Sequence, residues 1–241
     1  MVVLCDGMMR SGSTWSYNVA LRLLTACQRD RKTFGLYHDN PAVLAAAVRP
    51  RDSNVVIKSH ILDPSVREWC RTGAIKAIYT WRDPYDVVVS ITRMTGVSVG
   101  KATGLLKDAL RVWSFHQDTD SGCIISYETI LTRPMAGISS IADYLGLSIT
   151  AELLSEIAND VSFENVKRFS ERVDELSPRR VVRSSGLVYD RHTLLHLNHI
   201  KNGDIGYGLS LLSEGEMSAI NTVLQEEGFE SLVPNLELSD R

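Results

Sequence analysis

Short apolar runs recur along this chain, and each of them ends in polar residues. The runs cover residues 2–5, 55–57, 74–79 and 123–126. A continuous apolar run of this length is typical of a strand that is buried on both faces of a parallel sheet. We therefore predict strands at these positions in the centre of the fold.

Apolar residues recur at helical spacing between these strands. The predicted helices cover residues 13–27, 42–48, 64–71, 84–91, 101–117, 129–145, 150–159 and 213–227. Strands that alternate with helices predict a three-layer α/β/α fold with a central, mainly parallel sheet and right-handed crossovers. Two segments lack a clear pattern. We interpret residues 29–39 as a surface connection and the arginine-rich residues 168–199 as a mobile or ligand-ordered segment.

The first strand leads directly into a glycine-bounded loop, Gly7-Met8-Met9-Arg10-Ser11-Gly12-Ser13-Thr14-Trp15. Glycines at both ends of a six-residue span let the backbone curl with its N–H groups inward, and the helix that follows adds the positive end of its dipole. The pattern predicts an anion-binding loop. In the nucleotide-binding signature G-x-x-x-x-G-K-[ST], a lysine follows the second glycine, and here Ser13 stands in its place.

Polar residues also follow the later strands. Lys58-Ser59-His60 comes after the second strand, Arg82 follows the third, and Tyr127-Glu128 follows the fourth. The carboxyl ends of parallel strands face the ligand crevice of an open α/β sheet. We therefore expect these side chains to gather beside the anion-binding loop.

Composition limits the other classes of function. The 241 residues carry a net charge of −3 with a pI near 6.1, which argues against a general nucleic-acid-binding surface, because such a surface needs excess basic charge. The four cysteines show no metal-finger spacing, and no segment stays apolar over the ~20 residues that a membrane-spanning helix needs. We expect one domain over residues 1–241, in a reducing cytoplasm and without an export signal.

Taken in order, these motifs resemble those of the sulfotransferases that use 3′-phosphoadenosine 5′-phosphosulfate (PAPS). The phosphosulfate loop of that family, P-K-S-G-T-T-W, is similar to residues 9–15, and its K-[ST]-H element is similar to residues 58–60. Its 3′-phosphate motif, an arginine with a serine eight positions later, resembles Arg82 and Ser90. Weaker similarities are Tyr127-Glu128, Ser162-Phe163-Glu164 and Lys201-Asn202-Gly203 with Gly206, so the likeness spans residues 1–208.

The resemblance implies a role for each residue. His60 is the general base, Lys58 contacts the sulfuryl group, and Arg10 stands where the family has its loop lysine. The donor-binding residues that it implies are Arg10, Ser11, Gly12, Ser13, Thr14, Trp15, Arg82, Ser90, Tyr127, Phe163, Lys201, Asn202 and Gly203. Among them, Arg82, Ser90 and Lys201 bind the 3′-phosphate, and Trp15 and Phe163 flank the adenine. The product would be adenosine 3′,5′-bisphosphate (PAP).

The sequence departs from the family at three places. Arg10 can hold phosphate oxygens but cannot give up a proton at neutral pH. Gly206-Tyr207-Gly208 replaces the family's G-D-W, and Lys201-Asn202 replaces a basic pair, which the arginines of residues 168–191 could offset. No metal is expected, and structural roles are expected for the other histidines, namely His38, His116, His192, His196 and His199.

Two other functions remain open from the sequence. A P-loop kinase or nucleotidase acting on Mg-ATP shares the fold but needs a lysine after Gly12, and a non-catalytic nucleotide-binding protein needs neither Lys58 nor His60. Locally, Arg82 could simply pair with Asp86, and Trp15 could be a core residue. For a sulfotransferase, we expect a small-molecule acceptor, a natural product with a hydroxyl or an amine, chosen by residues 29–53, 92–103 and 168–200.

Overall fold

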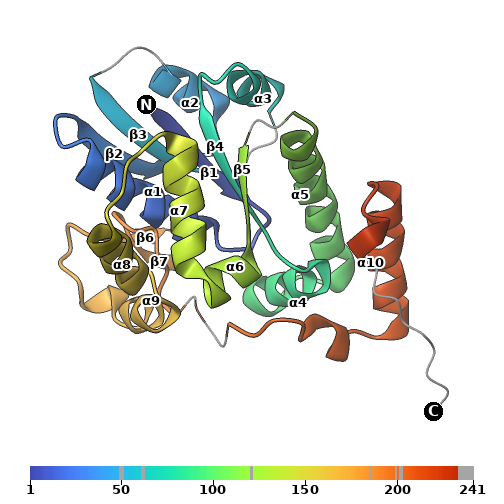
Figure 1. Ribbon diagram of the computed structural model, residues 1–241. Coiled ribbons are helices and arrows are strands. Elements are labelled where there is room, and N and C mark those ends of the chain that lie inside the picture. The colour runs from blue at the N-terminus through green and yellow to red at the C-terminus, as the bar shows by residue number, and fades with distance from the viewer. Residues whose placement is uncertain are drawn as a thin grey trace.

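A parallel sheet in the strand order β2-β3-β1-β4-β5 forms the centre of the computed structural model. The structure describes residues 1–48, 52–60, 63–119, 122–184, 186–198, 200 and 203–232. The strands are β1 (Val2–Gly7), β2 (Lys32–Tyr37), β3 (Ser53–Lys58), β4 (Lys76–Trp81) and β5 (Gly122–Ser126). Every neighbouring pair is parallel, so the carboxyl ends of all these strands lie at the same end of the sheet (Figure 1). The predicted parallel α/β fold is confirmed.

The edge strand β2 was missed by the sequence prediction, which was wrong to treat residues 29–39 as a surface connection. β2 pairs with β3 along its whole length, from Lys32 beside Ser53 to Tyr37 beside Lys58. Its side chains are largely exposed, with Phe34 52% and Tyr37 46% accessible. An exposed edge strand needs no apolar run, so nothing in its composition marked it as a strand.

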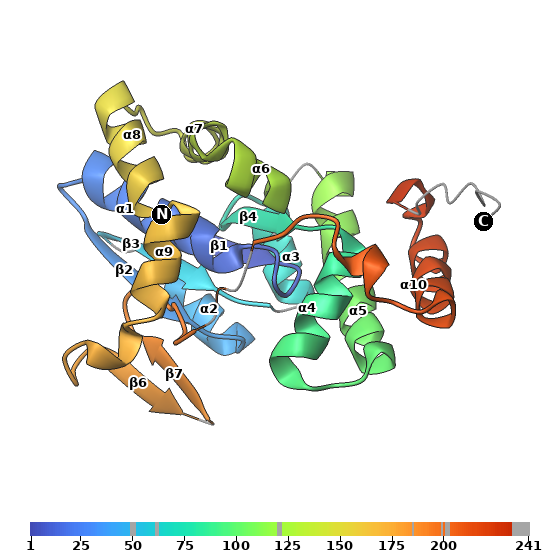
Figure 2. The same ribbon diagram turned by 90° about the horizontal axis from the view of Figure 1, so that it is seen from below.

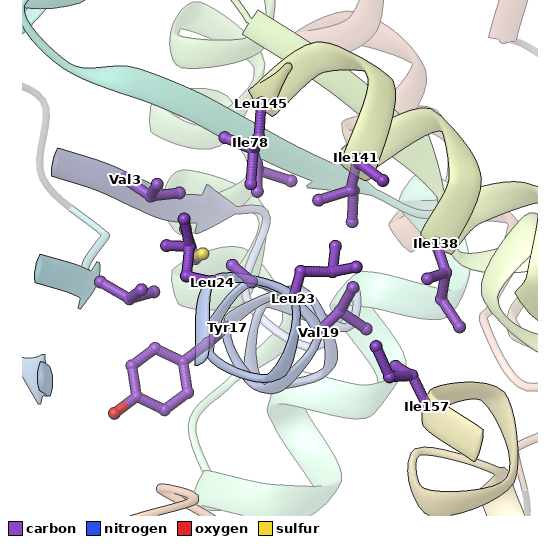
Figure 3. Packing of buried hydrophobic residues seen from close by; sticks show 14 of the residues in the cluster. Val3, Tyr17, Val19, Leu23, Leu24, Ile78, Ile138, Ile141, Leu145 and Ile157 are labelled. Carbon is purple, nitrogen blue, oxygen red and sulfur yellow. The ribbon is translucent and has the colours of Figure 1, made fainter. Parts of the chain in front are cut away.

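Helices cover both faces of the sheet (Figure 2). On one face, α1 (Ser13–Cys27) packs beneath α7 (Pro134–Leu145) and α8 (Ala151–Asp160). Figure 3 shows Leu23 and Val19 of α1 between the strands and Ile138, Ile141 and Ile157 of those helices. Burying apolar side chains of this size stabilises a fold by about 1.5–3 kcal/mol each, so α1 is anchored at the position from which it presents its N-terminus.

The opposite face is covered by α3 (Pro64–Arg71) and α5 (Val99–Thr119). Beside them, α4 (Pro84–Thr95) and α10 (Glu214–Glu226) form a further buried cluster with α5 and Tyr79 of β4. A short helix, α2 (Pro41–Val48), follows β2. None of the helices in the described part of the chain is both long enough and apolar enough to cross a membrane.

The helix predicted over residues 129–145 is two helices. α6 (Tyr127–Thr132) ends at Arg133, whose backbone is not helical, and α7 begins with Pro134 at its first position. Proline has no N–H to continue the hydrogen-bond ladder of the preceding turn, and it disfavours helical geometry in the residue before it. The chain therefore turns at Arg133 and starts a new helix.

Residues 163–184 and 186–198 form defined elements in the region where the sequence predicted a mobile or ligand-ordered segment without regular structure. They contain α9 (Phe163–Ser170), a 3-10 turn η1 (Val173–Glu175) and an antiparallel hairpin of β6 (Val181–Ser184) and β7 (Leu187–Asp190). The Arg180 guanidinium donates to both carboxylate oxygens of Asp190, at 3.0 and 2.8 Å. Arg172 likewise pairs with Glu175 at 2.7 Å. These arginines form ion pairs within the segment itself.

Two further 3-10 turns, η2 (Gly208–Ser210) and η3 (Glu230–Leu232), flank α10.

Candidate active site

The glycine-bounded loop begins where β1 runs tightly against β4. A Cβ atom on Gly7 would lie 2.2 Å from Thr80 Oγ1 and 2.6 Å from Thr80 O, so no other residue fits there. The buried Ser11 hydroxyl lies 2.6 Å from Met8 O and 2.8 Å from both Thr80 O and Thr80 Oγ1. These contacts brace the loop against β4.

The end of the loop presents the N-terminus of α1. Gly12 is the N-cap of α1 and has a left-handed φ of 98°, which favours glycine. Its carbonyl accepts from the N–H groups of Trp15 and Ser16. The N–H groups of Ser13 and Thr14 precede the first helical hydrogen bond and are placed to hold an anion. The Ser11 N–H was predicted to bind phosphate, but in the structure it donates to Met8 O and closes the turn of the loop.

Arg10 extends from the loop toward α4. It has a left-handed φ of 70°, and its Nε donates to Ser90 Oγ at 3.1 Å. Burial lowers the pKa of Arg10, although the group stays charged near neutral pH. Arg10 therefore belongs to the anion-binding loop and also contacts Ser90, one of the residues predicted to bind the 3′-phosphate.

Lys58 and His60 leave the end of β3 side by side. Lys58 Nζ lies 3.2 Å from His60 Nε2, and His60 Nδ1 lies 3.0 Å from the carbonyl oxygen of Gly7. Because a carbonyl can only accept, Nδ1 carries the proton and Nε2 carries the lone pair. Burial is the main cause that lowers the pKa of His60 to about 4 and that of Lys58 to about 8. His60 is thus a neutral base with a defined acceptor atom.

Asp39, which the sequence analysis did not single out, fixes this pair from the segment after β2. Its Oδ1 accepts from Ser59 Oγ at 2.9 Å and from the His60 N–H at 2.8 Å, and its Oδ2 accepts from the Tyr37 hydroxyl. The Tyr37 ring lies 5.1 Å from Lys58 Nζ. Recognising β2 as a strand would have placed Tyr37 and Asp39 at the same sheet edge as His60.

Arg82, at the end of β4, is buried and only 5% exposed. It pairs with Asp86 at 3.2 Å, and its guanidinium lies 4.1 Å from the ring centre of Tyr127 and 5.5 Å from that of Tyr207. Its Nε atom has no hydrogen-bond partner within the described ranges. The pairing that the sequence left open is therefore present, and one donor of Arg82 remains for a ligand.

A segment near the C-terminus, residues 203–208, crosses over Arg82, and we call it the strap. Asp204 O accepts from Arg82 Nη2 at 2.5 Å, while the N–H groups of Gly206 and Gly208 donate to the buried Asp86 carboxylate at 2.9 and 2.7 Å. At its start, a Cβ on Gly203 would lie 2.6 Å from the ring of Phe163. The strap thus brings Gly203 and Phe163 together near Arg82. The predicted residues Lys201 and Asn202 lie outside the described residues.

The remaining predicted residues are placed by packing. Trp15 lies against α7, where a Cβ on Gly137 would come within 3.2 Å of its ring. His116 is buried beside Tyr79, with a ring separation of 5.4 Å, and burial lowers its pKa to about 4, as befits a core residue. His196 stacks on Tyr189 at 5.3 Å. Burial, followed by the charges of Lys58 and Arg10, lowers the pKa of His196.

The chemistry of the site depends on basic groups around an anion-binding turn. Arg10, Lys58 and Arg82 supply fixed positive charges, and His60 supplies a base. Among the described residues, no three His, Cys, Asp or Glu side chains gather as a metal site would require. Such an arrangement suits the transfer of an anionic group, with charge stabilised by cations and a proton taken by histidine.

Comparison with known proteins gives one family. The family model described as the sulfotransferase domain matches residues 3–195. Among solved structures, the chain is similar to mouse sulfotransferase SULT7A1 complexed with PAP, with a TM-score of 0.69 and 16% identity over 97% of this chain and 89% of that one. It is also similar to retinol dehydratase in complexes with PAP and either androsterone or retinol, with a TM-score of 0.63 and 18% identity over 94% of this chain and 80% of that one. No curated protein sequence matches.

The family match covers the anion-binding loop, the Lys58-Ser59-His60 element and the Arg82 motif, which are the features on which the resemblance was based. It also covers far more than half of the chain. The chain therefore belongs to the sulfotransferase domain family and is a sulfotransferase.

Proposed function

We propose that this protein transfers a sulfuryl group from PAPS to a hydroxyl or amine of a small molecule, with His60 as the general base. The observation that carries the proposal is the state of the His60 ring. Its Nδ1 proton is directed to Gly7 O, so Nε2 is available to receive the acceptor's proton beside Lys58. General-base catalysis of this kind contributes typically ~10²–10⁴-fold to a rate.

The donor would lie along the carboxyl ends of the strands. The N–H groups of Ser13 and Thr14 hold the 5′-phosphate at the N-terminus of α1. The 3′-phosphate meets the unpartnered Nε of Arg82, with Ser90 and Arg10 beside it. Charge-assisted hydrogen bonds from guanidinium to phosphate are short and directional, which would favour a donor with a 3′-phosphate.

The transfer step moves one proton and one sulfuryl group. The acceptor oxygen or nitrogen gives its proton to His60 Nε2 and forms a bond to sulfur, while the bond between sulfur and the 5′-phosphate oxygen breaks and PAP leaves. In the structure, Lys58 Nζ lies 3.2 Å from Nε2, in the place that the acceptor's hydroxyl or amine must take. The acceptor therefore displaces Lys58 from His60, and the ammonium group then contacts the sulfuryl oxygens, where negative charge is stabilised.

A small acceptor is supported by the solved neighbours, since retinol dehydratase was crystallised with androsterone and with retinol. A natural product is the acceptor class we propose for this chain. Residues that would contact it follow β2, because the Tyr37 ring at the end of this strand lies beside Lys58. A kinase acting on Mg-ATP would instead require the lysine that Ser13 replaces.

The proposal is tested by His60→Ala. This change removes the base without touching the residues that hold PAP, so sulfuryl transfer should fall ~10²–10⁴-fold while the PAP dissociation constant stays within about threefold. Turnover with PAPS and an acceptor panel is measured together with PAP binding by calorimetry. His192→Ala is the matched control, because His192 is exposed and only its carbonyl makes a contact, with Tyr17. Full activity of His60→Ala would refute the base.

A further inference from the structure

Asp6 is a buried carboxylic acid at the end of β1, one residue before the anion-binding loop. Its side chain is 3% exposed. Oδ1 accepts from the Gly7 N–H at 2.7 Å, whereas Oδ2 has no hydrogen-bond partner among the residues that the structure describes. An acid with one oxygen unsatisfied in a buried position costs stability, so its presence needs a functional reason.

The carboxyl group lies directly behind the proposed base. Asp6 Oδ1 is 3.8 Å from His60 Nδ1, and the same Nδ1 donates to Gly7 O at 3.0 Å. Both backbone polar groups of Gly7 are therefore bound: its N–H donates to Asp6 and its C=O accepts from His60. This geometry keeps the His60 proton on Nδ1, on the side away from Lys58.

When His60 takes a proton at Nε2, the ring becomes positively charged in a buried site beside Lys58. Lys58 disfavours that charge. The Asp6 carboxyl group, 3.8 Å from the opposite nitrogen, favours it once Asp6 is ionised. Other groups also act on the ring. Asp39 faces it from the segment after β2, Lys58 from β3 and Gly7 O from the loop. Asp39 is bound to Ser59, Tyr37 and the His60 N–H, which leaves Asp6 as the carboxyl group near Nδ1.

We propose that Asp6 is a positioning residue for the sulfuryl-transfer reaction: it holds His60 with its proton on Nδ1 and stabilises the positive charge that the ring gains at Nε2. The inference rests on the proposed function of His60. Asp6 also lines a small cavity with Arg67 and His116, and Arg67 Nε has no hydrogen-bond partner among the described residues.

The isosteric change Asp6→Asn tests the inference, because an amide keeps the bond from the Gly7 N–H but cannot carry charge. Because burial raises the pKa of Asp6 to about 8, the comparison is made at about pH 9, where the carboxyl group is ionised. There we expect kcat for sulfuryl transfer to fall about 10–100-fold, the size of a lost charge-assisted contact to the protonated base. The KM for PAPS should stay within about threefold, because the Asp6 side chain contacts Gly7 and His60, neither of which is proposed to bind the donor.

Stability should move in the opposite direction. Burial raises the pKa of Asp6 to about 8, so the folded protein binds more protons than the unfolded chain from about pH 4 to pH 8, and wild-type stability declines across this range. Asn lacks this penalty. The melting temperature of Asp6→Asn should equal or exceed that of the wild type at pH 5, and its advantage should grow toward pH 8. The wild-type to variant ratio of kcat should also rise with pH, as Asp6 ionises.

Asp190→Asn is the matched control, because Asp190 is also a fully buried acid but pairs with Arg180 in the hairpin. Removing this paired carboxylate should lower the melting temperature and leave kcat within about threefold. An Asp6→Asn variant with wild-type kcat, or with kcat lost only in step with its melting temperature, overturns the inference. If His60→Ala retains full turnover, the proposed base itself fails, which is a separate outcome.

Discussion

A single buried arginine shows how one residue can be both structural and available to a ligand. Arg82 pairs with Asp86 and lies against two tyrosine rings, yet its Nε faces no partner within the described residues. Burying a charged guanidinium lowers the stability of the fold. The ion pair with Asp86 and the contacts with the two tyrosine rings offset much of this loss for Arg82. The remaining donor is then held rigidly, and we propose that it meets an oxygen of the 3′-phosphate.

Arg82→Gln should therefore weaken PAP binding by about 10–100-fold, corresponding to ~1.5–3 kcal/mol for a hydrogen bond to a charged group. Adenosine 5′-phosphate, which lacks the 3′-phosphate, should lose much less. Calorimetric titration of both nucleotides measures the difference. Arg93→Gln is the control, because Arg93 also lies over the Tyr207 ring, at 5.4 Å, but is exposed. Equal losses for the two nucleotides would remove Arg82 from the 3′-phosphate site.

At this scale, the sequence predicted those site residues that belong to local motifs. Lys58, His60, Arg82 and Ser90 follow strands that their apolar runs revealed. Asp6 and Asp39 could not be predicted in the same way. Asp39 acts through contacts with Ser59 and His60 on another strand, and Asp6 reaches His60 from a different strand and belongs to no sequence motif. Contacts of this kind depend on strand order, which no local pattern encodes.

At the scale of elements, the strap depends on α4 for its position. The first turn of α4 carries Asp86, and the N–H groups of Gly206 and Gly208 both donate to its carboxylate. A Cβ on Gly208 would lie 2.4 Å from the Tyr85 carbonyl carbon and 2.5 Å from the Asp86 nitrogen. The strap backbone therefore touches the helix backbone directly, which explains why glycine occupies this place in the Gly206-Tyr207-Gly208 sequence.

Gly208→Ala should push the strap away from α4 and lower stability by ~1–3 kcal/mol, as expected for overpacking. PAP binding should weaken with it, because Asp204 O and Gly206 help to hold Arg82 and Asp86. Thermal melting and PAP titration measure the two effects. Gly215→Ala in α10 is the control, since a Cβ there meets nothing within 4 Å and alanine favours a helix. A Gly208→Ala variant as stable as the wild type would contradict the close approach.

Among the elements, buried strands and most helices, including the short α2 and α3, were predictable, whereas β2 and the β6–β7 hairpin were not. β1, β3, β4 and β5 carry continuous apolar runs, but β2 and the β6–β7 hairpin mix apolar with polar residues and are largely exposed or half-buried. Their strand geometry comes from pairing with a neighbouring strand. An edge strand or a surface hairpin buries too few side chains for its sequence to alternate between apolar and polar residues.

At the scale of the whole molecule, basic groups converge on one edge of a sheet in a chain of net charge −3. Arg10, Lys58 and Arg82 come from the ends of three adjacent strands in the order β3-β1-β4. The fold thus concentrates positive charge locally, where low-dielectric walls strengthen its attraction for an anion. This explains how an acidic protein can bind a nucleotide with several negative charges.

PAP should therefore stabilise the whole fold without any divalent cation. At a concentration of 100 times its dissociation constant, a ligand that binds only the folded state adds ~2.7 kcal/mol of stability. Melting in the presence of a chelator, with PAP or with ATP, measures this. We expect a clear rise in melting temperature with PAP and a smaller one with ATP, which lacks a 3′-phosphate. Stabilisation only by Mg-ATP would favour the kinase alternative.

The position of β2 at the edge of the sheet has a consequence for the working temperature of the enzyme. Tyr37 and Asp39, which orient Lys58 and His60, continue directly from this strand, and β2 pairs with β3 on one side only. Edge strands open locally with less free energy than the core requires for global unfolding. Fraying of β2 would release His60 from Asp39 while α1 and the central strands remain packed, so we expect activity to be lost at a lower temperature than the one at which the protein melts.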